Sequence, residues 1–168
     1  MIFITLGSQK FQFNRLLKEI DALILDGVIK DEVFAQTGYS DYRPKNFNFK
    51  NFLDRDEFAL MMQKANLVIT HGGTGAIIGA VKKRKKVIAI PRLKKYGEHV
   101  DDHQIQLIEQ FENMDIIEAC YNSSDLRKAY STCITKKYKL YKSNTNKIIL
   151  SIDSFINNIE TGRDDKNG

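Results

Sequence analysis

Short apolar runs of strand length alternate with helix-length segments along this chain. The run at 2–6 leads into apolar residues at helical spacing between 11 and 25, and a second strand-like run follows at 32–37. Further strands are expected at 47–52, 66–70, 87–90 and 114–118. Strand–helix–strand order of this kind predicts an α/β fold with a mostly parallel sheet. With 168 residues and no internal repeat, the chain fits a single Rossmann-like domain.

The expected helices are marked by their first residues and by apolar stripes. Asp54 with Glu57 three residues later predicts a capping box, and further helices are expected over 76–81 and 102–111. Ser123 or Ser124 is expected to cap the next helix. An isoleucine-rich stripe at 148–159 predicts a last helix, so the domain is drawn as 1–160 with a polar, frayed tail at 161–168.

Composition excludes several classes of protein. Hydrophobic residues make up 42% and charged residues 28%, which excludes a disordered chain, a collagen and a coiled coil. The two cysteines, Cys120 and Cys133, are too few for a disulfide framework, so a reducing compartment is expected. No apolar run approaches the ~20 residues of a membrane-spanning helix, and a cytoplasmic location is expected. The net charge of +5 suits either solubility or an anionic partner.

Four segments follow predicted strands and should meet at one edge of the sheet, where ligands of parallel sheets bind. They are 7–9, 36–40, 71–75 and 91–103. The strongest signal among them is the glycine turn, Thr-His-Gly-Gly-Thr-Gly at 70–75. Its glycines allow close approach to backbone amides at a helix start, which attract phosphate. It matches neither the dinucleotide fingerprint nor the P-loop, and a plain strand-to-helix turn is the alternative.

The second signal is the polar loop, Glu-His-Val-Asp-Asp-His-Gln at 98–104. All three histidines of the chain, His71, His99 and His103, fall in this loop or in the glycine turn. Such donors and acceptors suit sugar hydroxyls; exposed histidines near a helix start and a metal site are the alternatives. The H-E-x-x-H spacing of helical metal sites is absent.

Together the glycine turn, the strand 87–91 and the polar loop resemble the carboxyl-terminal, donor-binding half of glycosyltransferase family 28. Within it, the short bacterial capsule and exopolysaccharide glycosyltransferase subunits are most similar. The shared features are Gly7-Ser8, the segment Phe-Asn-Arg-Leu-Leu at 13–17 and Gln-Thr-Gly-Tyr-Ser at 36–40. The catalytic subunit of the dolichol-linked GlcNAc transferase is also similar. The resemblance covers roughly residues 1–135.

The resemblance implies a two-domain GT-B architecture of which this chain is the donor-binding half. It implies that donor contacts come from three segments: Gly7 and Ser8; Gln36, Thr37 and Gly38; and His71, Gly72, Gly73, Thr74 and Gly75. From the polar loop, Asp102, His103 and Gln104 would also face the donor, and Glu98 and His99 are the expected catalytic pair. The helix at 76–80 lacks the glutamate that often contacts the ribose in full-length members.

The resemblance also implies an activity. An inverting hexosyltransferase would move galactose from a UDP-sugar to a polyprenyl-diphosphate-linked saccharide, without a cofactor or an obligatory metal. A membrane-anchored partner subunit would supply the acceptor half and hold the chain at the inner face of the cell membrane. A nucleotide-sugar sensor without turnover and a UDP-sugar epimerase-like fragment are the competing functions.

Three basic stretches complete the pattern. The run Lys-Lys-Arg-Lys-Lys at 82–86 precedes a strand, so it is expected at the sheet edge opposite the site. It suits a solvated turn, anionic lipid or a partner. Arg92, Lys94 and Lys95 follow that strand on the site side, and 136–142 mixes lysines with aromatic residues, as membrane-interface segments do. No nucleic-acid reader motif is present, so nucleic acid is not an expected partner.

Overall fold

The computed structural model describes residues 1–142, and these form one six-stranded sheet in the order β3-β2-β1-β4-β5-β6. Every neighbouring pair of strands is parallel, which confirms the predicted α/β class. The strands are β1 (Ile2–Thr5), β2 (Val33–Gln36), β3 (Asn48–Lys50), β4 (Leu67–Thr70), β5 (Lys86–Ala89) and β6 (Glu118–Ala119). The predicted helix at 148–159, the boundary at 160 and the tail at 161–168 lie outside the described residues.

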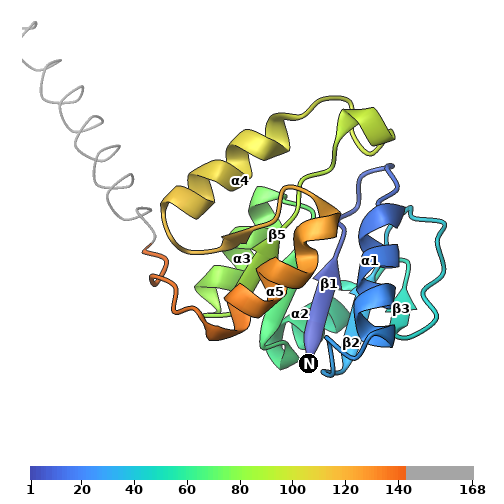
Figure 1. The fold of residues 1–168 in the computed structure, drawn as a ribbon, viewed down its shortest axis with the longest axis horizontal. Coiled ribbons are helices and arrows are strands. Elements are labelled where there is room, and N and C mark those ends of the chain that lie inside the picture. The colour runs from blue at the N-terminus through green and yellow to red at the C-terminus, as the bar shows by residue number, and fades with distance from the viewer. Residues whose placement is uncertain (143–168) are drawn as a thin grey trace, which may run out of the picture.

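In the described part of the chain, five α-helices cover the two faces of the sheet (Figure 1). They are α1 (Asn14–Leu25), α2 (Arg55–Lys64), α3 (Thr74–Lys82), α4 (His103–Asn113) and α5 (Leu126–Thr135). Side chains of α1 and α5 share one core with Ile2 and Ile4, whereas those of α2, α3 and α4 share the other with Phe3. Successive residues of β1 thus point to opposite faces, and burial on both faces explains why the central strands β1 and β4 are mostly apolar.

The structure confirms some predicted boundaries and corrects others. The capping box at Asp54 and Glu57 is present at the start of α2. The predicted strand at 114–118 is wrong for most of its length. Met114 caps α4, and Asp115 has a positive φ of 57°, so pairing begins only at β6. Neither Ser123 nor Ser124 caps α5, because Ser123–Asp125 forms a 3-10 turn that precedes the helix.

The topology fixes where a ligand can bind. β1 lies at the middle of the sheet, and the chain continues to β2 and β3 on one side and to β4, β5 and β6 on the other. Such a reversal leaves a crevice beyond the carboxyl ends of the two central strands. Here those strands are β1 and β4, which are followed by Gly7 and by the glycine turn.

None of the helices within residues 1–142 has both the length and the apolar character needed to cross a membrane.

Candidate functional site

A cavity of about 560 Å³ lies at the crevice between β1 and β4 and extends between α2 and α3. This volume is in the range of pockets that hold small-molecule ligands. Six of the residues predicted to contact a donor line it: Gly7, Ser8, Gln36, His71, Gly73 and Gly75. The remaining lining residues are Thr5, Gln9, Arg55, Phe58, Ala59, Met62, Ala76, Gly79 and Lys83.

The glycine turn lines this cavity with Gly73 and Gly75, whereas Gly72 and Thr74, which were also predicted to contact the donor, do not line it. Gly72 has a φ of +82°, and a Cβ there would meet Ile108 Cδ1 at 2.7 Å, so the turn requires glycine at this position. Gly73 caps α3 without a side-chain hydrogen bond. Within residues 1–142 the amides of Thr74 and Gly75 have no hydrogen-bond partner, and both residues are exposed. They give the helix start a free pair of donors for an anion.

His71 is buried beneath this turn. Burial and the positive charge of Arg92 lower the pKa of His71 to about 4, so its imidazole is neutral at pH 7. Nδ1 lies 3.3 Å from the Thr5 carbonyl oxygen, to which it can only donate, so Nε2 carries the lone pair. A Cβ on Gly73 would lie 2.6 Å from Nε2, and one on Gly7 would lie 2.9 Å from it. The imidazole therefore fills the space that the two glycines leave.

The segment after β2 contributes Gln36 to the cavity and packs its next residues elsewhere. Gln36 Oε1 accepts a hydrogen bond of 3.2 Å from the Leu53 amide. The amides of Thr37 and Gly38 donate to the carbonyls of Lys50 and Asn51, and neither residue lines the cavity. Gly38 has a φ of +57°, and its Cβ position lies 2.9 Å from the Gly7 carbonyl oxygen. Glycine at this position therefore allows the loops after β1 and β2 to approach each other closely.

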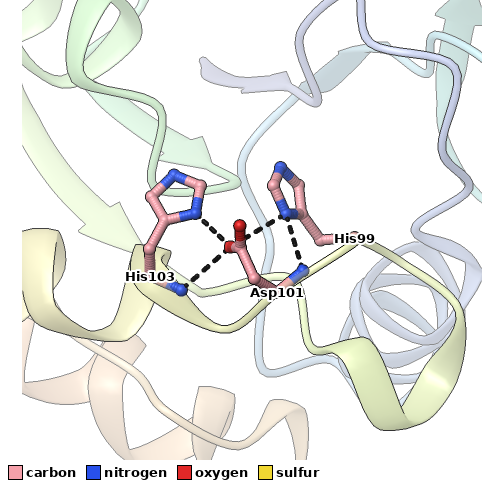
Figure 2. A group of neighbouring side chains, drawn as sticks. All are labelled: His99, Asp101 and His103. Atoms are coloured by element: carbon pink, nitrogen blue, oxygen red, sulfur yellow. Dashed lines mark hydrogen bonds and ion pairs between the residues drawn. The ribbon is translucent and has the colours of Figure 1, made fainter.

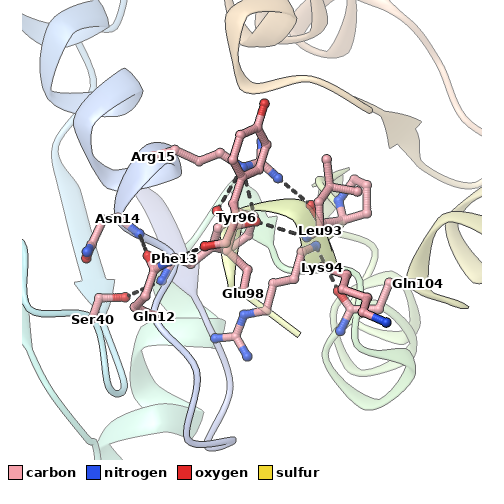
Figure 3. Close-up of polar contacts among 12 residues, drawn as sticks. Gln12, Phe13, Asn14, Arg15, Ser40, Leu93, Lys94, Tyr96, Glu98 and Gln104 are labelled. Atoms are coloured by element: carbon pink, nitrogen blue, oxygen red, sulfur yellow. Dashed lines mark hydrogen bonds and ion pairs between the residues drawn. The ribbon is translucent and has the colours of Figure 1, made fainter. Parts of the chain in front are cut away.

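Glu98 lies outside the cavity lining, where its carboxylate is held by Arg15 of α1 (Figure 3). Arg15 Nε donates to both carboxylate oxygens, at 2.8 and 3.1 Å, and Arg15 Nη2 donates to the Pro91 carbonyl at 2.6 Å. The Leu93 amide adds a third bond to Glu98 at 3.0 Å, and Glu98 is only 1% exposed. In this arrangement the carboxylate anchors the polar loop to α1, and both of its oxygens accept hydrogen bonds from the protein.

Two more polar-loop residues bind backbone amides of the segment that follows β5. Gln104 Oε1 accepts from the Arg92 amide at 2.9 Å, and Asp102 Oδ1 accepts from the Lys94 amide at 2.7 Å. Arg92 is fully buried, and its Nη2 donates to the carbonyls of Leu6 and Phe11 at 2.6 and 3.3 Å. Burial lowers the pKa of Arg92 to about 10, which leaves it charged at pH 7. Neither Gln104 nor Asp102 lines the cavity.

His99 and His103 flank Asp101 at the tip of the polar loop (Figure 2). His99 Nδ1 accepts from the Asp101 amide at 3.3 Å, so Nε2 carries the proton and donates to Gln9 Oε1, 3.2 Å from Nε2. Asp101 Oδ1 contacts His103 Nδ1, and hydrogen bonds from His103 lower the pKa of Asp101. Ligand atoms of the three residues lie within 4.8 Å of one another, a donor set that suits a transition metal. His99 reaches the cavity only through Gln9.

The residues that the sequence interpretation missed form the wall between α2 and α3. Phe58, Ala59 and Met62 of α2 face Ala76 and Gly79 of α3 across the cavity. Their apolar spacing is indistinguishable from that of a core-facing helix, so no local signal separates them from packing residues. Arg55 and Lys83 add positive charge to the same lining, and only their position in the folded chain reveals it.

Solved structures with a similar fold are glycosyltransferases. They include the glycosyltransferase of kitacinnamycin (16% identity, TM-score 0.59), MurG of Acinetobacter baumannii (16%, 0.55) and SnogD from Streptomyces nogalater (18%, 0.52). The matches cover 80%, 80% and 79% of this chain but only 35%, 41% and 37% of those proteins. The chain thus spans less than half the length of these proteins. No curated protein matches it.

The family model for the glycosyltransferase family 28 C-terminal domain matches residues 1–159. This range includes both central strands, the glycine turn and the polar loop. Because the match spans nearly the whole chain, the protein belongs to the glycosyltransferase family 28 C-terminal domain family.

Proposed function

We propose that this chain is the donor-binding half of an inverting hexosyltransferase that uses a UDP-sugar, with galactose as the expected sugar. The observation that carries the proposal is the 560 Å³ cavity at the crevice, together with the free amides of Thr74 and Gly75 at the start of α3. The membership in glycosyltransferase family 28 supports sugar transfer as the reaction class. The UDP carrier and the galactose remain parts of the proposal.

The diphosphate of the donor would bind at the glycine turn. The amides of Thr74 and Gly75 and the positive end of the α3 dipole favour an anion there without a metal. As the glycosidic bond breaks, negative charge grows on the departing diphosphate, and these fixed donors stabilise it where it develops. Arg55 and Lys83 raise the positive potential of the same cavity. The nucleoside would lie between α2 and α3, against Phe58 and Met62.

His99 is better placed to orient than to abstract a proton. Its Nδ1 lone pair receives the Asp101 amide, and its Nε2 proton points to Gln9, which lines the cavity. We therefore assign His99 and Glu98 to positioning, in place of direct catalysis: Glu98 fixes the loop through Arg15, and His99 fixes Gln9. The general base would then come from the acceptor half. His103, whose side chain is half exposed, stays a proposed donor contact.

The acceptor half would be supplied by a membrane-anchored partner chain that binds a polyprenyl-diphosphate-linked saccharide. The share of the similar structures that this chain spans, 35–41%, supports a missing half. Mixing the purified chain with such a partner should raise hexose transfer sharply. A nucleotide-sugar sensor would bind UDP-galactose equally well but show no transfer with any partner.

The site itself is tested by Gly75→Val. No protein atom lies within 4 Å of a Cβ at Gly75, so the variant should fold as the wild type does. Its side chain would stand where the diphosphate approaches the amides, and UDP affinity measured by calorimetry should fall more than about tenfold. Ser131→Val, at an exposed position of α5, is the matched control and should leave UDP affinity unchanged. Unchanged affinity in folded Gly75→Val would remove the glycine turn from the donor site.

A further inference from the structure

Two basic stretches that lie 50 residues apart in the sequence meet on one surface. The first is the run at 82–86, and the second is the segment 136–142, which continues from α5 and lies beside α3 (Figure 1). Lys86 Nζ joins them by donating to the carbonyls of Cys133 and Ile134, at 2.8 and 2.6 Å, at the end of α5. Both stretches line one groove of about 470 Å³. This juxtaposition turns two short charge runs into one continuous positive area.

Most of the cations on this surface are not neutralised by the protein. Lys85 and Lys86 donate to backbone carbonyls, and Lys136 pairs with Asp115 at 3.1 Å. The other cations are exposed and form no ion pair with any of residues 1–142. They are Lys82, Lys83, Arg84, Lys137, Lys139 and Lys142. Their charge calls for an anionic surface opposite them.

Apolar side chains are interspersed among these cations. Leu140 is 64% exposed, and Ile134 and Met114 are 49% and 48% exposed. Val81 and Ile116 line the groove, and a neighbouring groove of about 510 Å³ is lined by Met114, Leu140 and Tyr141 with two lysines. Basic residues mixed with exposed aliphatic and aromatic side chains are typical of membrane-surface segments. Nucleic acid would engage the cations and leave the aliphatic side chains in water.

We propose that this basic–apolar surface docks on a bilayer that contains anionic phospholipid. The surface comprises 82–86, 134–142 and Met114. The free lysines and Arg84 contact headgroup phosphates, while Leu140 and Ile134 enter the interface. Because the run at 82–86 precedes β5, the surface lies at the amino ends of the strands, opposite the glycine turn, and Lys83 is its one residue that also lines the donor cavity. A bilayer bound there leaves the glycine-turn end of the cavity open to solvent and to a second chain. The proposal does not depend on the sugar or on the reaction.

Vesicle co-sedimentation of the full chain tests the proposal. The probes are phosphatidylcholine vesicles with and without about one third phosphatidylglycerol. The wild type should bind the anionic vesicles and not the neutral ones. Arg84→Gln/Lys137→Gln/Lys139→Gln should weaken binding roughly 100-fold, since each charge near an anionic leaflet changes the affinity about fivefold. Lys18→Gln/Lys45→Gln/Lys128→Gln removes the same charge from exposed positions elsewhere and should change binding less than about threefold.

A second variant separates the apolar part from the charge. Leu140→Ser should remove most of the binding that survives about 0.5 M NaCl, where charge attraction is screened. Three results would overturn the proposal. The first is no binding of the wild type to anionic vesicles, which would point to an acidic protein as the partner. The second is equal weakening of vesicle binding by the two triple variants. The third is an Arg84→Gln/Lys137→Gln/Lys139→Gln variant that does not fold, together with single substitutions that fold and bind the vesicles as the wild type does.

Discussion

The glycine turn and the polar loop leave the same edge of the sheet, yet they offer their polar groups in opposite ways. In the turn, the backbone amides of Thr74 and Gly75 have no hydrogen-bond partner within residues 1–142, and Gly75 lines the cavity. In the loop, Glu98 accepts hydrogen bonds from Arg15, and Gln104 Oε1 accepts one from the Arg92 amide. Polar residues near a site can thus serve to hold a loop in place, whereas glycines can leave backbone amides available for binding.

The difference follows from burial. Glu98 is 1% exposed, and a buried carboxylate needs a partner, so Arg15 and the Leu93 amide satisfy it. Glycine amides at a helix start carry no such requirement, because exposed donors can be satisfied by water until a ligand arrives. Substitutions in each segment can distinguish residues that stabilise the fold from residues that are free to bind a ligand.

The largest effect on stability is expected for Glu98→Gln. Removing one partner of a buried ion pair costs about 3–5 kcal/mol, because the other charge is left without compensation. The midpoint of thermal unfolding should fall by roughly 6–20 °C for a chain of this length. The double variant Arg15→Met/Glu98→Leu removes both charges and should recover most of the loss. A wild-type melting temperature in Glu98→Gln, combined with lost UDP-galactose binding, would instead make Glu98 a sugar contact.

A smaller effect, up to about 3 kcal/mol, is expected from the titration of His71. The pKa of His71 is lowered from 6.5 to about 4, so the unfolded chain binds the proton more readily than the folded one. Stability should therefore be full above pH 6.5 and decline as the pH falls from 6.5 toward 4. The pKa of Asp21 is also lowered, so protonation of Asp21 should reduce the stability of the fold only below about pH 4.

Urea unfolding at several pH values between 7 and 4.5 measures this decline. His71→Asn retains a donor for the Thr5 carbonyl and removes the titration, so its stability should vary less over this window. Equal slopes for the variant and the wild type would show that His71 is not the group that titrates.

A clash between a side chain at position 73 and the His71 ring should lower the free energy of unfolding by about 1–3 kcal/mol. Gly73 has a φ of −68°, which any residue adopts, so only the His71 ring, 2.6 Å from the Cβ position, opposes Gly73→Ala. In the His71→Ala background the same change should be nearly neutral, and the two backgrounds form a double-mutant cycle. Gly75→Ala, with open space around its Cβ, is the control. A loss that persists without His71 would place the constraint in the backbone.

Much of the fold was predictable, because the central parallel strands are buried on both faces and mostly apolar, and every strand except β2 is followed by a helix before the next strand or the end of the described chain. The predicted strand at 114–118 failed because Asp115 adopts a left-handed conformation that apolar periodicity does not reveal. The glycine turn was predictable from its spacing after β4, and six predicted residues line the cavity. The Arg15–Glu98 pair spans 83 residues, and no local pattern shows that the polar loop is fastened to α1.

The smallest effect on stability is expected at the tip of the polar loop. His103 and Asp101 are both half exposed, and an ion pair at such a position is screened by water, so His103→Gln should change the unfolding free energy by less than about 0.5 kcal/mol. If His103 contacts the donor, the same variant should weaken UDP-galactose binding by roughly 2–10-fold, the value of one hydrogen bond, with UDP less affected. Melting temperature and calorimetric titration on the same sample measure both quantities. A drop in melting temperature as large as that of Glu98→Gln would show that the whole loop, including its exposed tip, is structural. Unchanged stability with weakened donor binding would divide the loop at His99, with fastening residues buried beneath it and binding residues exposed beyond it.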